Sequence, residues 1–100
     1  MDELIRTAIA EKWLISFMLH GQPRIGEPHD YGIINGVTKL FFYQIGGRSR
    51  SGPPVGWRWA PIAEISDLKV LDRHFAGPRP APSGRHARWD ELIATVSPRS

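Results

Sequence analysis

Three side chains that can carry protons or bind a metal lie within four positions of one another: Glu27, His29 and Asp30. In an extended chain alternate residues share a face, so Glu27 and His29 point to one side and Asp30 to the other. Two ligands without a third make a poor metal site. We favour a simpler interpretation, in which His29 hydrogen-bonds the backbone near Pro28, where a bulge is expected because proline cannot donate to a β-ladder.

A segment of arginines, serines and glycines indicates anion binding instead. Residues 46–54 read Gly-Gly-Arg-Ser-Arg-Ser-Gly-Pro-Pro, which is too rich in glycine and proline for regular structure. Backbone N–H groups of glycine-rich turns bind anions, and arginine adds forked donors. The alternative is a solvated loop. The candidate anion-binding residues here are Arg48, Ser49, Arg50, Ser51 and Arg58.

Aromatic and amide side chains near this segment extend the candidate ligand site. Trp57 and Trp59 share one face of a short predicted strand and could stack on a base, although such a pair is more often packing. Tyr43 and Gln44 point to opposite faces of their own strand. Gln44 lies in an apolar run, so it is either a structural hydrogen-bonder or part of a pocket floor. We include Trp57, Tyr43, Gln44 and His29 among the candidate ligand-binding residues.

Motifs typical of enzymes are absent from the sequence. It has no P-loop, no Gly-x-Ser-x-Gly and no histidine pair at helical metal-binding spacing. A small hydrolase using His29 with Tyr43 or Glu27 is the least favoured hypothesis, because local spacing supplies no nucleophile–base–orienter set. We therefore predict a protein that is not an enzyme and that uses no cofactor and no metal.

Basic charge is concentrated in the second half of the chain. Residues 1–47 have a net charge of −1 and residues 48–100 a net charge of +4, within a total of +3. Ten of the thirteen basic residues are arginine, which suits bidentate contact with phosphate or carboxylate. This composition suggests an anionic partner, although a charge of +3 is also ordinary for a protein surface. The basic residues of the tail include Arg79, Arg85, His86, Arg88 and Arg99.

A small β-sheet centred on residues 37–45 must position these side chains. That run is the densest stretch of β-branched and aromatic residues in the chain. Asn35-Gly36 precedes it, which predicts a two-residue hairpin turn that pairs it with residues 31–35. Alternation places Leu40, Phe42 and Gln44 on one face and Lys39, Phe41, Tyr43 and Ile45 on the other.

The remaining elements follow from hydrophobic periodicity. A helix is predicted over residues 3–12 with Asp2 as its N-cap, because Leu4, Ile5, Ala8 and Ile9 form one stripe. Strands are predicted at 13–20, 24–29, 56–60 and 67–71, with a helical turn at 62–65. The predicted core residues are Phe17, Leu40, Ile65 and Phe75.

The C-terminal quarter is less regular. Residues 77–84 contain three prolines and should be extended over the surface. The spacing of Trp89, Leu92, Ile93 and Val96 fits one face of a short helix, while Thr95 and Val96 also suit a strand. Both interpretations remain open at this stage.

Length and composition predict one soluble, cytoplasmic domain. One hundred residues are enough for one modest core. The chain lacks cysteine, which excludes disulfides and thiolate metal sites and fits a reducing compartment. Asp2 and Glu3 do not fit a signal peptide, and no apolar run approaches the roughly 18 residues of a membrane span.

Three sets of residues occur in a fixed order along the chain: Glu27-Pro28-His29 followed by Tyr31-Gly32, Leu40 with Tyr43-Gln44 and Gly47, and Trp57 eight residues before Ile65. Together with the order of the predicted elements, they resemble the WYL domain, in particular its short stand-alone forms, over about residues 4–80. Thr38 and Lys39 stand where the family's name-giving Trp and Tyr would fall. Ala60 and Glu64 depart from the family's later pattern.

This resemblance implies a mainly β protein with an N-terminal helix, built as a five-stranded Sm-like barrel. Residues 1–76 would form the barrel, and residues 77–100 a Pro/Arg-rich extension. It also implies a regulatory module that binds an anionic ligand, with nucleic acid or a nucleotide as the favoured class. The alternative is a protein–protein subunit or homo-oligomer that docks through its Pro-rich tail and exposed tryptophans. No membrane partner is expected.

Overall fold

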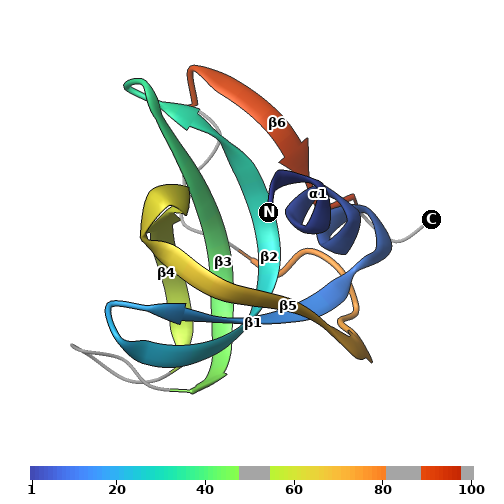
Figure 1. Ribbon diagram of the computed structural model, residues 1–100. Helices are drawn as coiled ribbons and strands as arrows, with labels where there is room; N and C mark the ends of the chain where they lie inside the picture. The colour runs from blue at the N-terminus through green and yellow to red at the C-terminus, as the bar shows by residue number, and fades with distance from the viewer. Residues whose placement is uncertain (48–54, 81–88, 98–100) are drawn as a thin grey trace.

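The computed structural model describes residues 1–47, 55–80 and 89–97, which form one helix packed on a strongly curved sheet (Figure 1). The elements are α1 (Asp2–Glu11), β1 (Trp13–Leu19), β2 (Gln22–Ile34), β3 (Val37–Gly47), β4 (Gly56–Pro61), the 3₁₀ turn η1 (Ile62–Glu64), β5 (Ile65–His74) and β6 (Glu91–Thr95). A mainly β fold with an N-terminal helix is therefore confirmed.

The strands form one antiparallel sheet in the order β4-β3-β2-β1-β5, and β6 pairs with β2 outside this path. The described residues thus contribute six strands where five were predicted. Among them no ladder joins β4 to β5, so the sheet is not closed by hydrogen bonds. In Figure 1, η1 turns the chain from β4 into β5, which crosses in front of β3 and pairs with β1.

The Asn35-Gly36 turn joins β2 to β3 as predicted. Ile34 pairs with Val37, and the φ angles of Asn35 and Gly36 are 50° and 77°. Both angles lie in the left-handed region that a type I′ turn requires and that asparagine and glycine tolerate best. The tight turn fixes the register of β3 between β2 and β4. The sheet was predicted to be centred on residues 37–45, but its middle strand is β2, which pairs with β1, β3 and β6.

The core lies between α1 and the inner face of the sheet. Ile5, Ala8 and Ile9 of the predicted stripe are buried, whereas Leu4, which was predicted to belong to it, is 45% exposed. All four predicted core residues are buried: Phe17, Leu40, Ile65 and Phe75.

Asp2 does not cap the helix as predicted. The helix begins at Asp2 itself and has no side-chain cap. The Asp2 carboxylate instead accepts a hydrogen bond from the Tyr31 hydroxyl at 2.5 Å and one from Arg6 at 2.9 Å. The side chain therefore ties α1 to β2, because a buried tyrosine hydroxyl requires a partner and Asp2 supplies it.

Of the two interpretations left open for the C-terminal segment, the strand is correct and the short helix is wrong. Residues 91–95 form β6 against β2, and the N–H of Val96 donates to the carbonyl of His29 at 2.8 Å. Gly32 makes this pairing sterically feasible. A Cβ there would lie 2.2 Å from the Glu91 carbonyl oxygen and 2.7 Å from the Trp89 ring.

Candidate functional site

Part of the predicted anion site lies outside the described residues. Arg48, Ser49, Arg50 and Ser51 fall in the range 48–54, and Arg85, His86, Arg88 and Arg99 fall in the ranges 81–88 and 98–100. Binding by these residues stays a prediction.

The other predicted ligand residues are divided between two faces of the β2–β3–β4 sheet. Phe42 pairs with Arg58, and Tyr43 pairs with Trp57. Because directly paired residues share a face and successive residues alternate, Arg58 lies on the face of Phe42 and Trp57 on the face of Tyr43. The predicted residues therefore form two separate groups: Gln44 and Arg58 on the inner face, and His29, Tyr43 and Trp57 on the outer face.

Arg24, which the motif analysis did not select, belongs to the inner group. It pairs with Phe17 of β1, and Gln44 pairs with the nearby Gly26. Arg24 is only 4% exposed, and its Nη1 donates to Oε1 of the fully buried Gln44 at 3.1 Å. Its Nε is buried without a hydrogen-bond partner.

Within the described residues, no carboxylate forms an ion pair with Arg24. All ten Asp and Glu side chains lie in this part of the chain. Burial lowers the pKa of Arg24 below its ordinary value, and the positive charge of Arg58 lowers it further. The inner group thus combines two guanidinium groups with an amide, an arrangement suited to an anion.

Glu27, His29 and Tyr43 form the outer group with a residue from far along the chain, Arg79. The Arg79 guanidinium donates from Nε and Nη2 to the two Glu27 carboxylate oxygens, at 2.6 and 2.9 Å. Its Cζ lies 4.2 Å from the centroid of the Tyr43 ring. The hydrogen bond to Glu27 raises the pKa of Arg79. Local spacing could not have predicted a contact between residues 52 positions apart.

His29 has the structural role that the sequence favoured. Its Nδ1 donates to the Glu27 carbonyl at 2.8 Å, and its Nε2 accepts from the Arg79 backbone N–H at 3.2 Å. These partners require the neutral ring with its proton on Nδ1, since a carbonyl only accepts and an N–H only donates. The register shift between Pro28 and Asp30 is the predicted bulge.

Asp30 points away from this group, as alternation predicted. Its carboxylate accepts a hydrogen bond from the Thr95 hydroxyl at 2.6 Å, so it links β2 to β6. Within residues 1–47, 55–80 and 89–97, no three His, Asp or Glu side chains are grouped so that they could hold a metal ion.

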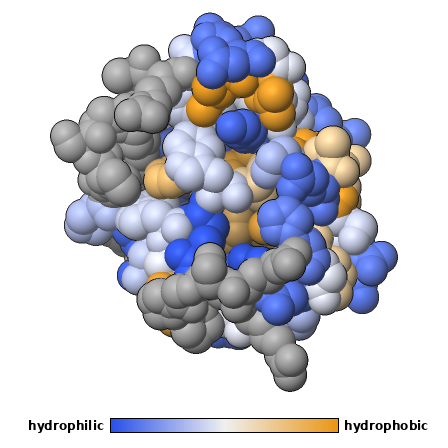
Figure 2. All heavy atoms as spheres, turned by 90° about the vertical axis from the view of Figure 1, so that its left-hand side faces the viewer, coloured by the Kyte–Doolittle hydropathy of each residue, from blue (hydrophilic) through white to orange (hydrophobic). Residues whose placement is uncertain are grey.

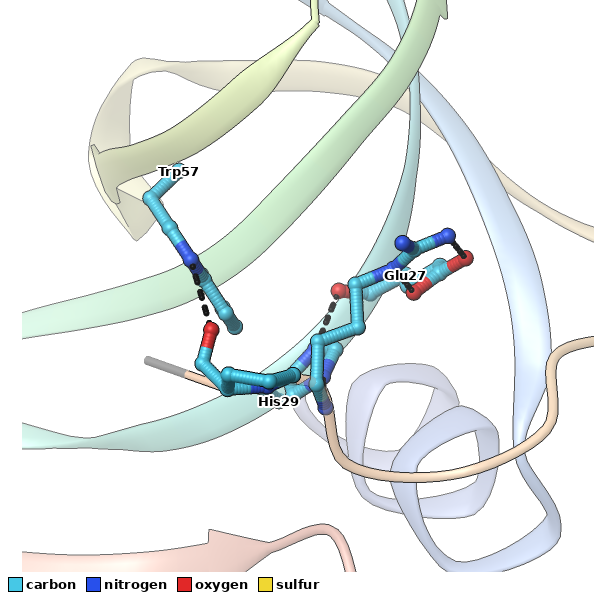
Figure 3. Close-up of polar contacts among 5 residues, drawn as sticks. Glu27, His29 and Trp57 are labelled. Atoms are coloured by element: carbon cyan, nitrogen blue, oxygen red, sulfur yellow. Dashed lines mark hydrogen bonds and ion pairs between the residues drawn. The ribbon is translucent and has the colours of Figure 1, made fainter. Parts of the chain in front are cut away.

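Trp57 completes the outer face and contacts the same distant segment. Its ring stacks on Phe41 with centroids 4.7 Å apart, and it packs edge-on against His29 at 4.8 Å. Its indole N–H donates to the Pro80 carbonyl at 3.2 Å. Figure 3 shows Glu27, His29 and Trp57 arranged around the segment that crosses this face.

A hollow of about 320 Å³ lies beside β1, β2 and β5. Its lining includes Phe17 and Arg24, which pair across β1 and β2, as well as Ser16, Ile25, Asp67 and Lys69. Arg24 therefore belongs both to the inner group and to the lining of this hollow.

Comparisons of the chain with protein-family models, with curated proteins and with solved structures found no match. Among the described residues, no helix is both long enough and apolar enough to cross a membrane.

Proposed function

We propose that this chain is a WYL-like regulatory module that binds an anionic ligand and catalyses no reaction. The ligand class that we favour is a nucleic acid or nucleotide, bound through phosphate. For its framework we propose an Sm-like barrel, which the strongly curved antiparallel sheet and the helix packed on it support. The observation that carries the functional proposal is the buried, unpaired charge of Arg24.

Burying a guanidinium without a counterion lowers the stability of the folded protein. The desolvation penalty of a buried ion is on the order of several kcal/mol, and a paired carboxylate normally offsets it. Gln44 offers Arg24 only a neutral acceptor, and Arg58 adds repulsion. A phosphate oxygen would supply both the missing charge and an acceptor for Nε. A bound anion would therefore stabilise the inner group.

The described residues on either side of the predicted basic segment belong to the strands that carry this group. Arg24 pairs with Gly47, the last residue of β3, and Arg58 lies two residues after the start of β4. Residues 48–54 connect these two strands, so Arg48 and Arg50 are close in sequence to both positions. This placement supports one continuous phosphate-binding region made by the loop and the inner group.

The salt dependence of oligonucleotide binding tests this proposal. If Arg48, Arg50 and the Arg24–Arg58 pair each neutralise one phosphate of a single strand, the slope of log K against log[salt] should be about −2, from roughly −0.7 per contact. Arg50→Ala should flatten the slope by about 0.7 without changing sequence preference, because phosphate contacts position the ligand without specifying its sequence. The measurement is a titration of a labelled oligonucleotide at several salt concentrations.

Arg6→Ala is the matched control, because Arg6 is an exposed arginine on α1 that is paired with Asp2. It should leave the slope unchanged. Absence of binding by the wild type at low salt would contradict the proposal, as would an Arg50→Ala slope equal to that of the wild type.

A second candidate function is docking of a protein partner through exposed aromatic surface. Trp59 is 40% exposed although it packs against Phe41 and Trp89, with centroids 4.4 and 5.4 Å away. Among the coloured atoms of Figure 2, apolar surface near the centre and at the top of the view lies next to hydrophilic residues. Apolar surface with a polar rim is typical of interaction sites.

A further inference from the structure

The outer face of the sheet is covered by an extended piece of the same chain. Residues 76–80 follow β5 and form no helix or strand, yet they make specific contacts with β2, β3 and β4. The Arg79 side chain is held by a carboxylate and an aromatic ring. Its backbone N–H and the Pro80 carbonyl are held by a histidine and a tryptophan (Figure 3).

These contacts are the elements of extended-peptide recognition. Proline-rich segments dock on aromatic surfaces because their extended backbone is preformed and keeps its polar groups available. Here the Trp57 indole N–H donates a hydrogen bond to a proline carbonyl, and the Glu27 carboxylate accepts two hydrogen bonds from one arginine side chain. Lysine has no such planar fork, so Glu27 gives the site a preference for arginine.

The sheet holds these side chains in place by contacts of its own. The Nδ1 of His29 is bonded to the Glu27 carbonyl, and Trp57 is stacked on Phe41, all within β2, β3 and β4. The Glu27 side chain is only 7% exposed, whereas that of Arg79 is 43% exposed. The side chains that hold the segment thus belong to the strands, and Arg79 is the more accessible partner of its ion pair with Glu27.

We propose that this face is a binding site for arginine–proline peptides, and that residues 77–80 occupy it from within the chain. The partner is an extended segment in which arginine is followed by proline, as in Gly-Pro-Arg-Pro of this chain itself. The chain's own segment competes with that partner. This proposal does not depend on the anion site, because the inner group lies on the opposite face of the sheet.

The test removes the internal competitor and supplies the peptide from solution. The full chain carrying Arg79→Ala is titrated with a blocked Gly-Pro-Arg-Pro peptide while the Trp57 indole N–H is followed by NMR. We expect saturable binding that shifts this signal. The wild type should bind at least about tenfold more weakly, because a tethered segment competes at an effective concentration in the millimolar range.

Matched controls identify the recognition chemistry. A Gly-Pro-Lys-Pro peptide should bind at least about tenfold more weakly to the Arg79→Ala chain, because it lacks the fork. Adding Glu27→Gln to that chain should abolish the difference between the two peptides. Should Arg79→Ala fail to fold, Arg79→Lys keeps a positive charge beside Tyr43 and replaces it in the same titration.

Two results would overturn the proposal. One is that a folded variant, Arg79→Ala or Arg79→Lys, does not bind the arginine peptide or binds the lysine peptide equally well. The other is that a variant binds guanosine monophosphate but does not bind the arginine peptide. A guanine edge also presents two parallel N–H donors to a carboxylate. That outcome would assign the face to a base.

Discussion

Arg24 is the residue on which the proposed anion site depends. Its position on β2 was predicted to be extended, but the sequence offered no reason to bury it. Its face depends on its pairing with Phe17 of β1, a contact between strands. Arginines in the glycine-rich loop attracted attention because of local composition, whereas Arg24 can be recognised only by its burial and its missing counterion.

Arg24→Met should cost little stability in the absence of ligand. Replacing a buried ion by an apolar side chain of similar volume is often neutral or stabilising, while loss of the hydrogen bond to Gln44 costs about 1 kcal/mol. We expect a net loss below about 1 kcal/mol, together with weaker oligonucleotide binding. Denaturant unfolding and the binding titration measure the two effects.

Leu40→Ala supplies the comparison, since Leu40 is fully buried in the core. It should lower the free energy of unfolding by about 2–5 kcal/mol. If Arg24→Met is as damaging as Leu40→Ala, then Arg24 is a structural residue and our interpretation of its charge is incorrect.

At the scale of single elements, the sequence predicts structure that depends on neighbouring residues. It does not predict contacts between residues that are far apart along the chain. The Asn35-Gly36 hairpin depends on neighbouring residues and was predicted correctly. Residues 91–95 have a hydrophobic pattern that fits helix or strand, and pairing with β2 decides between them. The same holds for the Glu27–Arg79 pair, which only the folded chain brings together.

Gly36→Val tests the hairpin. A β-branched residue resists the φ of 77° observed at this position, so the substitution should lower the free energy of unfolding by roughly 1–2 kcal/mol. Denaturant titration measures the change. Gly21→Val would be a similar test at the β1–β2 turn, where φ is 74°. A Gly36 variant as stable as the wild type would show that this turn can adopt another geometry.

Gly32→Ala tests the docking of β6 on β2. The added Cβ would overlap the Glu91 backbone and the Trp89 ring, so β6 must shift. We expect loss of amide hydrogen-exchange protection in residues 91–96, while protection in β3 is retained. Uniform loss of protection across the sheet would show instead that β6 unfolds only together with the whole domain.

At the scale of the whole molecule, the Asp2–Tyr31 hydrogen bond links the stability of helix docking to pH. This bond is the main cause that lowers the pKa of Asp2 below 3.8. A carboxyl whose pKa is depressed on folding contributes stability above its unfolded pKa and loses it as pH falls through the folded value. Burial, with the same hydrogen bond, raises the Tyr31 pKa to about 12, so that contribution is complete below pH 10 and is lost toward pH 12.

Tyr31→Phe should therefore weaken the dependence of stability on pH at both extremes. Unfolding free energies between pH 3 and 7, and between pH 9 and 12, would measure it by denaturant titration. We expect the variant to lose less stability than the wild type below about pH 4 and above about pH 10. Identical pH profiles for the two proteins would show that the hydrogen bond does not persist in solution.

The end strand β5 has a further consequence for how this protein behaves at high concentration. A strand at the end of a sheet presents unpaired backbone groups that can template pairing with another chain. Along β5, the exposed charged residues Asp67, Lys69, Asp72 and Arg73 alternate in sign. Charges on an edge strand discourage such pairing. These charges should therefore disfavour aggregation by strand pairing at this edge. Replacing them with apolar residues should make such aggregation more favourable.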